Sequence, residues 1–115
     1  DYTAELLVCQ KIQGEYNIYT AIATDKKTFL TIASKFAGEQ FTVIDEMTIA
    51  SVAEFLNVHN GVFLVNMSNQ NIELQMEPHK FYQQAKIEKK EGPYIIPIYL
   101  MDCKFDLIIS NTELP

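Results

Sequence analysis

The 115-residue chain has a formal net charge of −6 and contains nine lysines but no arginine, so it lacks the basic surface that nucleic-acid binding needs. With 48% hydrophobic and 21% charged residues, its composition is that of a globular domain with one core, and no apolar run approaches the roughly 18 residues of a membrane span. We therefore expect a single domain over residues 1–115, cut from a longer protein, whose partners include neither nucleic acid nor membrane.

The two cysteines, Cys9 and Cys103, lie far apart in strand-like stretches. Two distant cysteines make neither a metal site nor a disulfide framework, so we expect both to be small buried residues. Because no export signal is visible, a cytoplasmic location is expected.

The first half of the chain predicts a hairpin followed by two helices. Residues 5–12 and 15–24 are β-rich runs on either side of Gly14, and their alternation is typical of paired strands. Asp25 can cap a helix over 26–37 that Gly38 ends.

A longer helix is expected to run from about residue 44 into the 60s. Thr42 with Asp45, three residues later, resembles a capping arrangement at its start. A competing interpretation ends this helix at His59, makes "NG" a turn and makes "VFLV" a strand.

The second half predicts an antiparallel sheet. Residues 71–77 alternate as a half-buried strand that Pro78 ends. Residues 80–87 form either a strand or an irregular crossing, 89–93 a turn, and 94–100 with 104–110 a closing hairpin in which Pro97 marks an edge or a bulge. The order of elements predicts an α+β fold, a two-layer sandwich of one antiparallel sheet and two main helices.

The long helix has two different faces at 100° per residue. One carries the expected core stripe, which consists of Ile49, Val52, Leu56, Phe63 and Met67. The other surrounds Glu54 with small, apolar or amide side chains, namely Met47, Ala50, Asn57, Val58, Gly61 and Val65. This second face suits docking of another protein rather than solvation.

Glu54 and Asn57 lie three residues apart and point the same way. Glu54 can accept a hydrogen bond from a cation, and Asn57 offers a donor and an acceptor that can orient a water molecule. The same pair also occurs by chance on many helices, because Glu is a good helix former.

The stretch "EFLNVHNG" (54–61) resembles the Glu-x-x-Asn-x-x-x-Gly signature of the CheC/CheX/FliY phosphatases of bacterial chemotaxis, and it looks most like CheX. "NIELQMEP" (71–78) resembles the strand and proline after that signature, and "PYIIPIYLMDCKFDLIIS" (93–110) resembles the closing hairpin with its Ile-Pro step. The resemblance covers roughly residues 5–110. Ala50 stands where such motifs often have Asp or Ser, and the helix that precedes the first strand in CheX proteins is lacking.

The resemblance implies the CheC/CheX-like sandwich, with the Glu-x-x-Asn motif on its long helix. It also implies hydrolysis of the phospho-aspartate of a CheY-like receiver. Asn57 would orient the attacking water and Glu54 would engage the receiver lysine, while Met47, Ala50, Val58 and Gly61 would contact the partner. No cofactor of its own is implied, because the receiver would supply Mg²⁺. A homodimer joined through the sheet is also implied.

Two other classes of function are considered. A non-catalytic interaction module would use the same face to bind a receiver without turnover. A small-molecule sensor would need an apolar pocket between helices and sheet, for which the sequence gives no argument. Of the two histidines, His59 is expected on the buried side of the helix and His79 in solvent.

Overall fold

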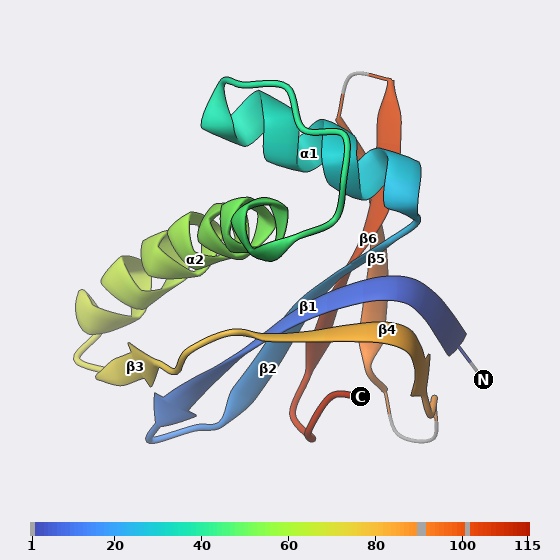
Figure 1. Ribbon diagram of the computed structural model, residues 1–115. Helices are drawn as coiled ribbons and strands as arrows, with labels where there is room; N and C mark the ends of the chain where they lie inside the picture. The colour runs from blue at the N-terminus through green and yellow to red at the C-terminus, as the bar shows by residue number, and fades with distance from the viewer. Residues whose placement is uncertain (1, 90–91, 101) are drawn as a thin grey trace.

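The computed structural model describes residues 2–89, 92–100 and 102–115. Two helices lie on one side of an antiparallel sheet (Figure 1). This confirms the predicted α+β class. The elements in chain order are β1 (Tyr2–Gly14), β2 (Ile18–Thr24), α1 (Lys26–Ala37), α2 (Glu46–Ser68), β3 (Leu74–Met76), β4 (Lys80–Ile87), β5 (Tyr94–Leu100) and β6 (Cys103–Ser110).

The long strand β1 organises the sheet, whose order is β3-β1-β2-β6-β5. β4 also pairs with β1: residues 2–9 of β1 face β4, and residues 12–14 face β3. The predicted hairpins β1–β2 and β5–β6 are both present. Pro97 lies on the edge strand β5, as its missing amide hydrogen requires. The predicted turn at 89–93 lies partly outside the described residues.

Alternation along the strands gives the sheet two apolar faces. Leu6, Val8 and Ile22 pack with Phe29 of α1 and Leu56 of α2 in the core between sheet and helices. The intervening side chains form a second cluster on the opposite face, where Leu114 of the C-terminal segment joins them; its strand members include Leu7, Cys9, Ala21, Ala23 and Ile108. Both cysteines are buried and free.

Both helices are capped by aspartate. Asp25 accepts a hydrogen bond from the backbone of Thr28 at the start of α1, and Gly38 ends that helix in the left-handed region at φ 72°. At α2 the predicted pairing of Thr42 with Asp45 is wrong. α2 begins at Glu46, so Asp45 is the N-cap itself and exchanges hydrogen bonds with Thr48, the third residue after it.

The long helix runs unbroken from Glu46 to Ser68, so the alternative in which it stops at His59 is wrong. Its core stripe is inward as predicted, with Val52 and Leu56 fully buried and Ile49, Phe63 and Met67 half-buried. α2 extends to Ser68 and a hydrogen-bonded turn follows it. The predicted strand over 71–77 is therefore shorter, and only Leu74–Met76 pairs as β3.

α2 is also long and apolar enough, by length and composition, to cross a membrane, with a mean hydropathy of 1.2. Core helices of globular domains meet the same criterion, and here its inner side packs on α1, β1 and β3. Its exposed apolar residues, which include Met47, Val58, Val62 and Val65, lie on the side turned away from the core.

Candidate functional site

Glu54 and Asn57 lie side by side in the middle of α2, on the side turned away from the core. Glu54 is exposed and Asn57 is half-buried. Asn57 Nδ2 donates a hydrogen bond of 3.4 Å to Glu54 Oε1. The spacing of three residues thus brings carboxylate and carboxamide together, as predicted.

The two side chains line a groove of about 440 Å³ between α2 and the segment that connects β3 to β4. Glu54, Asn57 and Ala50 come from the helix, and Met76, Glu77, Pro78 and His79 line the groove from the β3–β4 side. A loop of another protein that enters this groove would meet the Asn57 carboxamide. Neither His79 nor this wall was predicted as part of the site.

A chain of hydrogen bonds, partly buried at Asn57 and buried at Asn60, holds Asn57 from the side of the core. Gln10 Nε2 of β1 donates to Asn57 Oδ1 at 3.0 Å and to the backbone oxygen of Glu77 at 3.0 Å. Asn60 Nδ2 donates to Gln10 Oε1 at 2.7 Å and to Thr20 Oγ1 at 2.8 Å. Gln10 and Asn60 are only 5% and 3% exposed. The two bonds from Asn60 are therefore shielded from water, whereas the Gln10–Asn57 bond is partly buried and borders the groove.

Sequence reasoning missed Gln10 and Asn60, although each interrupts a pattern. Gln10 occupies an inward position of β1 in the series Leu6, Val8, Gln10, Ile12, where an apolar residue is expected. Asn60 lies one helical turn after the buried Leu56. A buried amide at such a position must find partners, and here the two amides find each other.

Of the predicted docking residues, Ala50 lines the groove, and the others lie elsewhere on α2. Met47 and Val58 are 62% and 51% exposed, and Ala50 is exposed. Gly61 has no atom within 4 Å of the position that a Cβ would take, so another backbone has room to approach it. Val62 and Val65 are exposed as well. α2 contains Glu46 and Glu54 but no lysine or arginine, which makes this face apolar and acidic.

A comparison with models of known protein families shows the family to which the chain belongs. The model of the family described as chemotaxis phosphatase CheX matches residues 6–99, a span that includes the groove, the amide chain and the Glu-x-x-Asn motif. The chain belongs to the CheX family.

Solved structures share the CheX-family fold at low sequence identity. The chemotaxis protein CheX from Desulfovibrio desulfuricans superposes with a TM-score of 0.76 at 15% identity, over 95% of this chain and 75% of that one. CheX from Vibrio vulnificus gives 0.73 at 18%, over 94% and 76%. CheX from Borrelia burgdorferi, in a CheX–CheY–BeF₃–Mg²⁺ complex, gives 0.71 at 24%, over 91% and 74%. No curated protein matches the chain significantly.

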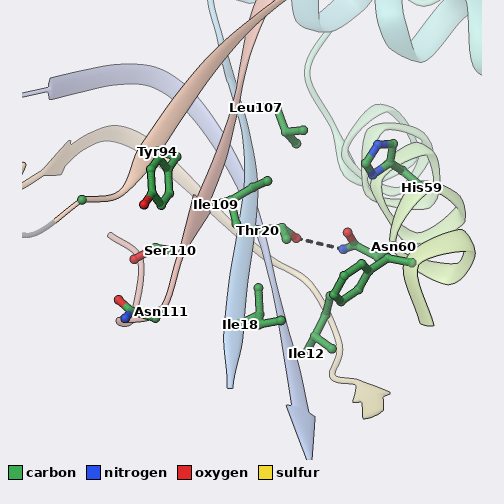
Figure 2. A pocket seen from close by; sticks show the side chains of 12 residues that line it. Ile12, Ile18, Thr20, His59, Asn60, Tyr94, Leu107, Ile109, Ser110 and Asn111 are labelled. Carbon is green, nitrogen blue, oxygen red and sulfur yellow. Dashed lines mark hydrogen bonds between the residues drawn. The ribbon is translucent and has the colours of Figure 1, made fainter. Parts of the chain in front are cut away.

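This member of the CheX family has a second hollow, of about 510 Å³, between the C-terminal half of α2 and the sheet (Figure 2). No pattern in the sequence predicted this hollow. Its walls are mostly apolar, with Ile12, Ile18 and Ile109 among them. The buried polar groups at its base, Asn60 and Thr20, face each other and are already hydrogen-bonded (Figure 2). The hollow therefore has the shape that a sensor would need but no unpaired buried polar group to orient a ligand.

The CheX-family site contains no metal cluster of its own within the part of the chain that the structure describes, where no group of three or more His, Cys, Asp or Glu side chains could hold an ion. The two histidines lie at surface positions. His59 is exposed, so its expected place on the buried side of α2 is wrong. Asn60, the next residue along the helix, takes the inward position instead.

Proposed function

We propose that this protein hydrolyses the phospho-aspartate of a CheY-like receiver, with Asn57 orienting the attacking water and Glu54 engaging the receiver lysine. The observation that carries the proposal is the fixed, half-buried Asn57 carboxamide in an open groove, next to an exposed carboxylate. Membership of the CheX family supports the reaction class.

Asn57 retains hydrogen-bonding capacity for this task. Its Oδ1 accepts one hydrogen bond from Gln10, which leaves a lone pair that can accept from a water. Its Nδ2 has a second hydrogen that can donate to a phosphoryl oxygen. A water that donates to Asn57 Oδ1, while Asn57 Nδ2 holds the phosphoryl oxygen, would have its oxygen lone pair directed at phosphorus.

The reaction needs no protein nucleophile. The water oxygen forms a bond to phosphorus while the bond from phosphorus to the aspartyl oxygen breaks, which releases inorganic phosphate and an aspartate carboxylate. Positioning one water is worth on the order of 3–4 kcal/mol, or about 10²–10³ in rate. The partner receiver supplies Mg²⁺ and the cations that stabilise the transferred phosphoryl group; the Borrelia burgdorferi relative is complexed with CheY, BeF₃ and Mg²⁺.

Glu54 has two roles in this proposal: it contributes to docking, and it holds Asn57 Nδ2 until a receiver binds. In the free protein it accepts the long hydrogen bond of 3.4 Å from Asn57. When a receiver lysine approaches, Glu54 exchanges this weak contact for a charge-assisted one. Asn57 Nδ2 is then released toward the phosphoryl group, so that the site becomes active on docking.

The assembly and location are part of the same proposal. The edge strand β5 exposes Tyr94, Ile96, Tyr99 and Leu100, and an apolar edge of this kind suits pairing with a second copy to form a homodimer. A cytoplasmic location is proposed with it, because a CheY-like receiver is a cytoplasmic partner.

The alternative is a non-catalytic module that binds a receiver. The apolar, acidic face of α2 would suffice for it. The test is to phosphorylate a CheY-like receiver from the same organism and to follow its decay with and without this protein, while binding is measured in parallel. Accelerated decay supports the phosphatase, binding without acceleration supports the module, and the absence of both refutes the two proposals together.

A further inference from the structure

Gln10 lies at a break in the sheet that explains its unusual contacts. β4 pairs with β1 as far as Cys9, and β3 pairs from Ile12 onward. Gln10 therefore faces the connection between β3 and β4, where the Glu77 carbonyl is free to accept the hydrogen bond from its side chain. The Glu77 amide meanwhile donates to Lys11 O at 2.9 Å and fixes this connection to β1.

The hydrogen-bonding capacities in the chain allow one orientation of each amide. A backbone carbonyl can only accept, so the group of Gln10 that faces Glu77 O must be its NH₂. The same NH₂ faces Asn57, which must therefore present its Oδ1. On the other side, Gln10 Oε1 needs a donor, which is Asn60 Nδ2.

We infer that Gln10 is a positioning residue: it fixes the Asn57 carboxamide with Oδ1 inward and Nδ2 outward, the orientation that hydrolysis requires. The inference rests on the function proposed above. Gln10 touches neither receiver nor water in this account and acts through Asn57 alone.

The orientation needs this external support because the terminal amide torsion of asparagine is broad and nearly two-fold. Without a donor from Gln10, Asn57 would also populate the reversed orientation and turn toward solvent. Losing the position of a water in this way costs on the order of 10-fold to 100-fold in rate. Docking depends on Glu54 and the outer face of α2, whereas Gln10, although it lines the groove, is only 5% exposed.

The experiment compares the Gln10→Met variant with wild type. Met has a similar length and shape but cannot donate. Ser51→Ala is the matched control. Ser51, which belongs to α2, is buried like Gln10, and its hydroxyl donates to Ala33 O at 2.9 Å, away from the amide chain. For each protein, kcat and KM are measured on the phosphorylated receiver, and the side-chain amide resonances of Asn57 are recorded by NMR.

We expect Q10M to lower kcat at least about 10-fold while KM stays within about two-fold, and to broaden or shift the Asn57 amide resonances. S51A should leave both unchanged. Unaltered Asn57 resonances in Q10M, or an unaltered kcat beside an active wild type, would overturn the inference.

Two further outcomes remain decisive. If wild type does not hydrolyse the receiver phosphate, the proposed function fails, and the NMR comparison still decides whether Gln10 orients Asn57. If Q10M does not fold, a wild-type crystal structure that distinguishes nitrogen from oxygen decides instead. Asn57 Nδ2 facing Gln10 would overturn the inference, and Oδ1 facing it would support it.

Discussion

Replacing Asn60 by leucine tests whether the buried amides join α2 to the sheet. Leucine has a similar shape but removes the donor of two hydrogen bonds, of 2.7 Å to Gln10 and 2.8 Å to Thr20. Gln10 Oε1 loses the one donor that it has among the residues the structure describes. Thr20 Oγ1 also loses a donor but keeps its own bond of 3.3 Å to Gln10 O.

The structure sets the size of the effect. Each buried acceptor left without a donor costs about 1–3 kcal/mol, and the apolar leucine surface returns roughly 1 kcal/mol. We expect N60L to lower the free energy of unfolding by about 1–5 kcal/mol, a substantial part of the roughly 5–15 kcal/mol of an ordinary domain.

Urea unfolding followed by circular dichroism measures this quantity, provided that the slope with denaturant stays constant. The control is Asn66→Leu, the same change at an exposed position of the same helix, which should stay within about 0.5 kcal/mol of wild type. N60L as stable as wild type would refute the claim that these hydrogen bonds hold α2 in place.

Three further predictions concern the docking face and the core. Gly61→Ala should stabilise the protein by up to about 1 kcal/mol in calorimetry, because the added Cβ meets no atom within 4 Å and alanine favours the helix. The same change should weaken receiver binding in a titration, and tighter binding would contradict the assignment of the docking face. Val58→Asp should weaken binding at least about 10-fold with little change in Tm. The control Asn66→Asp, at an exposed position about 180° round the helix from Asn57, should not, and equal losses would refute the assignment of that face. Burial raises the pKa of the Cys9 thiol to about 12, and Lys80 partly opposes the shift. Because the folded-state pKa is raised, this group's contribution to stability is complete below the unfolded-state pKa near 9, and it falls by up to about 1.4 kcal/mol per pH unit from there toward pH 12. The free energy of unfolding should therefore depend less on pH in this range in Cys9→Ala, and an unchanged pH dependence would contradict this reasoning.

The sequence was sufficient for the elements whose residues carry local signals. Asp25 and Gly38 mark the ends of α1. The helical spacing of apolar residues predicts that α2 continues beyond His59, and the helix ends at Ser68. The faces of α2 were predictable at its centre, where Glu54 and Asn57 turn outward and Leu56 inward.

What sequence could not provide depends on contacts between distant residues. The pairing of Gln10 with Asn57 and Asn60 joins residues 47 and 50 positions apart, and no local rule specifies it. The same holds for the groove wall at Glu77–His79, which exists because β3 and β4 share one edge of β1. His59 was misplaced because an ideal angle of 100° per residue decides poorly between neighbours at the boundary of a face.

The central claim is that Asn57 orients the water that hydrolyses a receiver's phospho-aspartate. The most direct measurement is the rate of phosphate release from a phosphorylated CheY-like receiver at saturating concentrations of wild type, Asn57→Ala and Asn66→Ala, the last being an exposed asparagine on the same helix. The account predicts a loss of about 10²–10³ in N57A with binding retained, and a wild-type rate in N66A. Equal acceleration by N57A and wild type would contradict it.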